Sequence, residues 1–193
     1  RDSQPESFLE ATKWSPNTTF SLMGRPRLNS FFTTTERLPE AHFDLKRQSI
    51  FDGPFFYEGE NSAARLYKKF SKDTPGFNDF HATRVDSFHQ ILYPKQYFGW
   101  LNITPRVGGR ATFYDRSRLN ANQPSVVRGV LNTGIELGFK TARTWKDVND
   151  KQWEIDGMRH IIEPSINYEF VTRPNRRPSE LYPFDVDRSS FGI

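Results

Sequence analysis

The sequence contains no cysteine, which excludes a disulfide framework and any metal centre built on thiolates. It also lacks any uninterrupted apolar run of about 18 residues, so no transmembrane helix is expected. Helical periodicity is scarce: only residues 59–70 could form a short helix, and the same residues equally continue a strand. Apolar residues make up 35% of the chain, a low share for a soluble globular protein, yet aromatic residues reach 15%.

Sequence signatures of catalysis are missing as well. The chain has no GxSxG, P-loop or GxGxxG motif, and none of its histidines falls at a zinc-binding spacing. Asp185 and Asp187 resemble a carboxylate pair, but two acids in a loop usually belong to a turn. We therefore expect that the protein is not an enzyme and uses no catalytic residue, metal or cofactor.

The net charge of +4 is compatible with an ordinary basic surface. Arg173, Arg176 and Arg177 lie near Tyr182, and nucleic-acid-binding surfaces use such mixtures of cations and rings. Prolines in the same stretch favour a loop over a binding platform, so we expect no nucleic-acid partner.

Alternation of apolar and polar residues with a period of two dominates the chain. It predicts strands over 7–14, 18–28, 40–49, 54–66, 82–93, 99–114, 127–141 and 158–171. Asp52-Gly53 lies between two of these runs and is a strong hairpin signal. Short turns alternate with long polar connectors, except at 143–156, where the expected short turn is replaced by a long polar stretch that we interpret as an extended turn. The predicted fold is an all-β antiparallel meander of about seven or eight long strands.

The length of the strands favours a membrane crossing over a soluble sheet. Alternation continues from residue 99 to residue 114, whereas strands in soluble proteins average about five or six residues. Aromatic residues cluster at Tyr97–Trp100 and again at Phe113 and Tyr114. About fourteen residues tilted by about 40° span about 35 Å, which suits an apolar band with an aromatic girdle at each edge. We therefore predict part of the wall of a large transmembrane β-barrel, although the rings could instead fill the core of a soluble sheet.

In a barrel wall, parity assigns each side chain to the lumen or to the lipid. The charged parity is predicted to face the lumen at Arg106, Arg110, Arg128, Glu136, Lys140, Arg159, Glu163 and Glu169. The four arginines of this set are hypothesised to tune the lumen toward phosphate groups. The apolar parity is predicted to face lipid at Leu101, Ile103, Val107, Phe113, Leu131, Ile135, Leu137, Ile162, Ile166 and Tyr168. The strand prolines Pro26, Pro105 and Pro164 share this apolar parity, and each is expected to mark a bulge or a weak strand pair because proline donates no ladder hydrogen bond.

Four stretches stand in a recognisable order: TERLPEAHFDL at 35–45, FGWLNITPRVGGRATFYD at 98–115, GMRHIIEPSINYEFV at 157–171 and YPFDVDRSSFG at 182–192. They resemble, respectively, the R-x-P-E strand entry, the L-x-P-x-x-G-x-R-x-T-x-Y strand, the LRH-x-IEP-x-x-x-Y segment and the FD-x-x-DR loop in the barrel of the LptD family, also called OstA. The chain begins with Arg and not Met, which suggests an excerpt or a processed chain. We expect residues 1–193 to be a single partial domain, an interior segment of such a barrel without the N-terminal jelly-roll domain and the C-terminal strands.

The resemblance implies a function in assembly of the Gram-negative cell envelope. The family receives lipopolysaccharide from a periplasmic bridge, works with an LptE-like plug lipoprotein, and inserts the lipid into the outer leaflet of the outer membrane through a lateral opening of the barrel. The implied partners are lipopolysaccharide, the plug, the bridge and membrane lipids. No gate residue can be assigned, because the first and last strands of the barrel are not identifiable here. Another outer-membrane barrel, such as a porin or an adhesin anchor, and a soluble carbohydrate-binding β-sandwich remain alternatives.

Overall fold

A computed structural model describes residues 7–72, 76–117, 125–150, 152–182 and 184. Its strands are β1 Leu9–Trp14, β2 Thr18–Arg25, β3 Thr34–Ser49, β4 Phe56–Lys69, β5 Phe80–Leu92, β6 Lys95–Tyr97, β7 Leu101–Tyr114, β8 Val126–Phe139, β9 Thr141–Asp150, β10 Ile155–Ile162 and β11 Ser165–Val171, followed by a short 3₁₀ helix, η1 Pro178–Glu180. The main sheet has the order β1-β2-β3-β4-β5-β7-β8-β11, with β6 added beside β7. All its pairs are antiparallel, which confirms the all-β meander of about eight strands. None of the described helical residues forms a helix long and apolar enough to cross a membrane.

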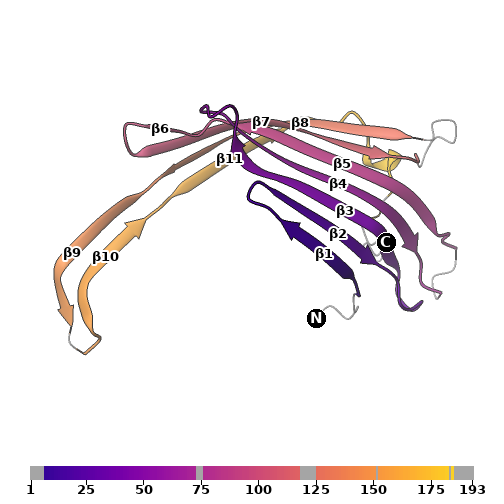
Figure 1. The fold of residues 1–193 in the computed structure, drawn as a ribbon, viewed down its shortest axis with the longest axis horizontal. Coiled ribbons are helices and arrows are strands. Elements are labelled where there is room, and N and C mark those ends of the chain that lie inside the picture. The colour runs from indigo at the N-terminus through magenta and orange to yellow at the C-terminus, as the bar shows by residue number, and fades with distance from the viewer. Residues whose placement is uncertain (1–6, 73–75, 118–124, 151, 183, 185–193) are drawn as a thin grey trace.

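Contrary to the prediction of an extended turn, most of the stretch 143–156 is strand. β8 continues beyond Lys140 as β9, and β10 leads into β11 through Glu163 and Pro164. β9 and β10 pair with each other alone, and this arm extends away from the main sheet (Figure 1). A salt bridge between Lys140 and Glu163 joins the two segments of the chain that form the base of the arm. The arm escaped prediction because backbone pairing sustains it without an apolar face over RTWKDVNDKQWEID.

Of the three prolines expected in strands, only Pro105 lies inside one. Pro26 directly follows β2, and Pro164 separates β10 from β11. The Pro105 carbonyl accepts a hydrogen bond from the Tyr93 N–H at 3.0 Å, on the side where β7 changes its partner from β5 to β6. Pro105, which has no N–H to donate, therefore lies where β7 is paired with neither β5 nor β6. On its other side, the pairing of β7 with β8 continues unbroken through Pro105.

The hairpin between β3 and β4 forms around Asp52-Gly53, but its turn residues lie one position earlier than this pair. Phe51 (φ 52°) and Asp52 (φ 53°) take left-handed conformations, and the Gly53 N–H donates to the Ile50 carbonyl at 2.9 Å. This is the geometry of a type I′ turn, in which Asn, Asp or Gly is favoured at both central positions. Phe51 is therefore a strained choice at this turn, with its ring almost fully exposed.

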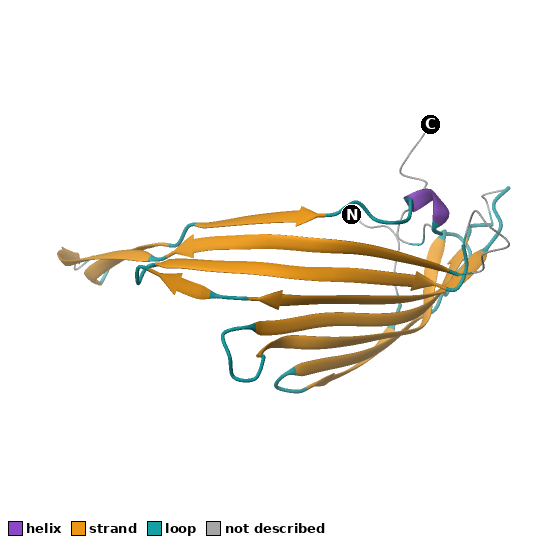
Figure 2. Ribbon diagram, turned by 90° about the horizontal axis from the view of Figure 1, so that it is seen from above, coloured by secondary structure: helices purple, strands orange, loops and turns teal. Residues whose placement is uncertain are grey.

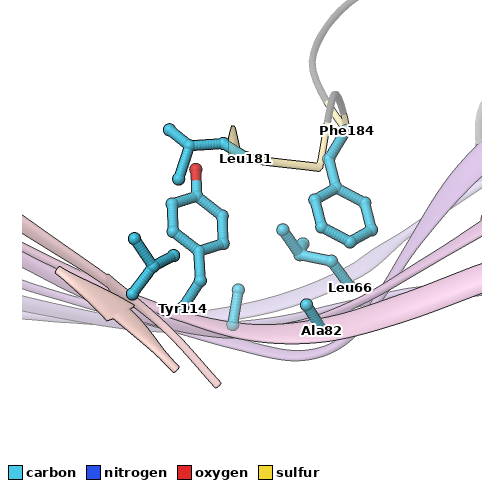
Figure 3. Close-up of a cluster of buried hydrophobic side chains, with 7 residues drawn as sticks. Leu66, Ala82, Tyr114, Leu181 and Phe184 are labelled. Atoms are coloured by element: carbon cyan, nitrogen blue, oxygen red, sulfur yellow. The ribbon is translucent and has the colours of Figure 1, made fainter. Parts of the chain in front are cut away.

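The main sheet has two faces of different chemistry, and its strands lie side by side in Figure 2. We call the inner face the one that carries Leu66, Ala82 and Tyr114, on which Leu181 and Phe184 pack (Figure 3). The opposite side is the outer face. Strands contact only their neighbours in a sheet, so among the described residues no second layer covers the outer face. The outer face therefore exposes many large apolar side chains.

The buried apolar cluster lies at one end of the inner face. The segment that follows β11 returns over this end, where the Thr35 hydroxyl donates to the Phe184 carbonyl at 2.9 Å. Phe80 stacks against Tyr182 with ring centroids 4.9 Å apart. The connector after β4 gathers at the same end, where the Ser71 hydroxyl donates to the Phe31 carbonyl at 2.8 Å. Side chains and connectors thus pack one end of the inner face, and next to this end the inner face carries polar and charged side chains.

Candidate functional site

Strand register lines up polar side chains across the inner face. His42, Ser62, Asp86, Thr112 and Arg128 are successive partners on β3, β4, β5, β7 and β8. Because neighbouring strands lie about 4.8 Å apart, this row crosses about 19 Å of the sheet. The rows on either side add further charged groups around a cavity of about 460 Å³, namely Arg37, Glu40, Asp44, Glu60, Arg84 and Arg110.

Asp86 is the centre of the hydrogen bonding in this cavity. Its carboxylate accepts from the Thr112 hydroxyl at 2.5 Å and from Arg110 Nε at 2.7 Å. The Asp86 side chain is 13% exposed, whereas that of Arg110 is 53% exposed. The Asp86 carboxylate therefore compensates the positive charge of Arg110, while part of the Arg110 guanidinium remains exposed to the cavity.

Glu40 is the most deeply buried charged group at the edge of the cavity. Its side chain is 1% exposed, and its carboxylate contacts Arg37 Nη1 at 3.0 Å and His42 Nε2 at 3.3 Å. Removing a carboxylate from water costs several kcal/mol unless partners compensate for it. Arg37 supplies that compensation, so this group fixes the wall of the cavity and is not free for a ligand.

Arg106 has a similar structural role further along the same face. Its Nη2 donates to Asn167 Oδ1 at 2.8 Å and to Glu169 Oε2 at 3.2 Å, so the side chain reaches from β7 across β8 to β11. Gly134 makes this path possible, since a Cβ at that position would lie 2.8 Å from Arg106 Nε. Arg106 therefore links β7 to β11 across β8, and the Glu169 carboxylate compensates its charge.

Arg128 differs from Arg106 and Arg110, the other two arginines on this face that are predicted to act on phosphates. Its Nε is buried without a hydrogen-bond partner, and the described residues supply no ion pair for its guanidinium. On the opposite side of the cavity, Asp44 and Glu60 face each other directly across β3 and β4. Like charges in such a pair repel, and no cation among the described residues is paired with either of them. The cavity thus offers an unpaired cation on one side, two unpaired acids on the other, and hydroxyl groups between them.

The remaining predicted lumen residues are placed as follows. Glu136 lies on the inner-face parity of β8, opposite Thr104 and Asn167. Lys140 and Glu163 pair with each other at the base of the arm. Arg159 lies on β10 opposite Thr144, outside the sheet that carries the cavity. The structure thus brings Arg110 and Arg128 into one cavity and leaves the other predicted residues outside it.

The residues predicted to face lipid share the outer face, apart from Ile162 on the arm. Register joins Ile103 with Leu137 and Ile166, and Ile135 with Tyr168, across β7, β8 and β11. The most exposed members of this set are Val107, Leu131, Ile166 and Tyr168, and Leu101 and Phe113 lie on the same parity of β7. The pair Asp185 and Asp187 and most of the stretch 182–192 lie outside the described residues.

Sequence reasoning missed the half of the cavity that β3, β4 and β5 contribute. Alternation in 40–49 and 54–66 already placed Glu40, His42, Asp44 and Glu60 on the charged parity of their strands. The missing information was the register, which brings these groups opposite Asp86 and its neighbours. Within the described ranges, no group of three or more His, Asp or Glu side chains is placed to hold a metal ion. The chain matches no protein-family model, and no curated protein is detectably similar to it in sequence.

Proposed function

We propose that this chain forms part of the wall of an outer-membrane β-barrel that inserts lipopolysaccharide into the outer leaflet. The observation that carries the proposal is the contrast between the two faces of one long-stranded sheet. The outer face exposes side chains such as Leu131 (65% exposed) and Ile166 (67% exposed), while the inner face holds a charged, hydrogen-bonded surface. Exposed apolar surface of this extent indicates contact with lipid or another partner.

Strand length supports a membrane crossing. β4, β7 and β8 each contain 14 residues. At the usual strand rise and a tilt of about 40°, such a strand spans about 35 Å along the membrane normal. Only a closed barrel satisfies every backbone group of a sheet in lipid, so neighbouring strands must continue the wall beyond β1 and β11. Each of these two strands has one edge without a partner among the described residues.

The inner face suggests how the polar part of lipopolysaccharide is accommodated. Arg106 and Arg110 are held by carboxylates and stabilise the wall, whereas Arg128 has no carboxylate partner in the described part of the chain and is available to a phosphate group. The hydroxyls of Ser62 and Thr112 lie in the same row and suit a sugar. In this proposal the head group passes along the polar face while the acyl chains leave sideways into the membrane. The plug lipoprotein and the periplasmic bridge belong to the same proposal and rest on the resemblance to the LptD family.

The two alternatives fit the structure less well. A soluble carbohydrate-binding β-sandwich needs a second sheet against the outer face, and no strand packs there among the described residues. The barrel wall of a porin or an adhesin anchor has the same two faces. Only contact with lipopolysaccharide therefore distinguishes the proposed function from these alternatives.

Photocrosslinking in living cells tests the substrate. A photoreactive residue at Arg128 in the full-length protein should crosslink to lipopolysaccharide, and one at Ile166 on the outer face should crosslink to phospholipid. Lipopolysaccharide adducts that are absent from position 128, or equal at both positions, would contradict the proposal.

A further inference from the structure

A hydrogen-bonded chain of polar side chains lies on the outer face of the sheet. Tyr57 Oη lies 2.7 Å from His89 Nδ1, and His89 Nε2 lies 2.7 Å from Ser87 Oγ. The Ser87 hydroxyl donates to Asn61 Oδ1 at 2.8 Å, and Asn61 Nδ2 donates to the Phe43 carbonyl at 3.4 Å. These directions agree when His89 is neutral with its proton on Nε2, a tautomer assigned from the network.

The hydrogen bonds of this side-chain network pair its polar groups with one another, which explains how the network can lie on an apolar face. Tyr57 donates to His89, His89 donates to Ser87, and Ser87 donates to Asn61. The His89 ring lies over Gly59, where a Cβ would collide with Nδ1. Since each polar group has a partner within the chain, none of them demands water or a polar ligand.

Two of these residues, Ser87 and His89, form one wall of a shallow cavity of about 490 Å³ on the outer face. Register places Ala111 and Gly129 beside Ser87 in one row, and Gly109 and Leu131 beside His89 in the next. The far wall consists of Leu131 and the segment 172–175, which closes the edge of β8 through hydrogen bonds such as Leu131 N–H to Thr172 Oγ1 at 2.9 Å. A Cβ added at Gly129 would meet no atom within 4 Å, so the floor is open at this point.

Arg173 contributes the one charge of the far wall. Its side chain is exposed, lines the cavity, and has no ion pair or hydrogen bond within the described part of the chain. The backbone groups of the floor are engaged in strand pairing, and the Tyr57–Asn61 chain satisfies its own groups. An occupant must therefore be apolar along the floor and anionic at the Arg173 end.

We infer that this cavity binds one anionic phospholipid, with an acyl chain across Gly109, Ala111 and Gly129 and the phosphate at the guanidinium of Arg173, which the long side chain allows to lie nearer the membrane surface than Leu131. The inference rests on the proposed function only in requiring that the outer face lies in a bilayer. It adds a resident lipid on the face opposite the lipopolysaccharide path. A peptide or a second copy of the chain fits less well, because the backbone groups of the floor are already engaged in strand pairing and the floor is apolar.

Native mass spectrometry of the full-length protein in nanodiscs tests this occupant. The discs contain phosphatidylglycerol and phosphatidylcholine in equal amounts. One retained phosphatidylglycerol is expected, favoured about fivefold over phosphatidylcholine, the factor that one cation near a membrane surface provides. Gly129→Leu fills the floor and should abolish retention, while Thr133→Leu, on the same face of the same strand, should not.

A second variant changes only a charge, so its result does not depend on whether Gly129→Leu folds. Arg173→Gln should retain a lipid but lose the preference for phosphatidylglycerol, while Arg116→Gln, an exposed arginine that does not line the cavity, should leave the preference unchanged. No retained phospholipid, a retained lipopolysaccharide or second chain instead, or equal retention in Gly129→Leu and Thr133→Leu would overturn the inference. Lipopolysaccharide crosslinking at position 128 is scored separately in the Gly129→Leu variant. Loss of the lipid with intact crosslinking supports the cavity, and a wild-type protein that crosslinks yet retains no phospholipid overturns the cavity alone.

Discussion

Replacing Leu131 by arginine distinguishes a lipid-facing surface from a water-facing one. Leu131 lies near the middle of β8 on the outer face and is 65% exposed, so the substitution removes little packing within the chain. At the midplane of a bilayer an arginine costs about 2–4 kcal/mol on a barrel exterior. In water the same exposed substitution changes stability by less than about 0.5 kcal/mol. The expected loss for Leu131→Arg is therefore about 2–4 kcal/mol.

Val127→Arg is the matched control, since Val127 lies on the same face of the same strand and is also exposed. Four residues of a strand tilted by about 40° place it about 10 Å nearer the membrane surface, where an arginine costs about 0–1 kcal/mol. Urea unfolding of the full-length protein in lipid vesicles, followed by tryptophan fluorescence, measures both variants. Equal losses below about 0.5 kcal/mol for the two variants would refute the assignment of the outer face to lipid.

Three further changes test the inner face and one turn. Asp86→Asn removes the carboxylate that neutralises its neighbouring arginine, so the lipopolysaccharide crosslinking yield of a probe on β8 should rise; a fall would mean that the carboxylate itself holds the ligand. Gly134→Ala places a Cβ 2.8 Å from Arg106 Nε and should cost about 1–3 kcal/mol in urea unfolding, whereas Gly138→Ala meets no atom closer than 3.6 Å and should cost less. Phe51→Asn relieves a left-handed phenylalanine and should raise stability by about 1 kcal/mol, and unchanged unfolding would show that the turn is not strained.

Alternation in the sequence was sufficient to predict the elements whose two faces differ. In 99–114 the apolar and charged residues alternate, and β7 occupies Leu101–Tyr114 with Arg106 and Arg110 on one face. Side-chain parity follows from the strand pleat alone, so it needs no knowledge of the neighbours. The two faces of the sheet were therefore accessible from the sequence.

Features that depend on pairing between distant strands were not accessible. The stretch 143–156 of the β9–β10 arm shows no apolar alternation, and only its register, such as Trp145 opposite Met158, reveals the strands there. The partners of the predicted arginines were missed for the same reason, since Asp86 meets Arg110 only through the β5–β7 register. The turn at Phe51 contradicts local preference, because a phenylalanine takes the conformation that favours Asn or Gly.

Cysteine accessibility along β8 tests the central claim, that the outer face lies in lipid and the inner face in water, most directly. The 193 residues contain no cysteine, so single cysteines introduced from 130 to 137 give unique labelling sites within this segment. Intact membranes that carry the full-length protein are treated with a water-soluble maleimide. The account predicts that residues 130 and 136, on the inner face, react and that residues 131, 133, 135 and 137, on the outer face, are protected; residues 132 and 134 are buried by their neighbours in the sheet and do not serve as labelling sites. Equal labelling at consecutive positions would contradict it.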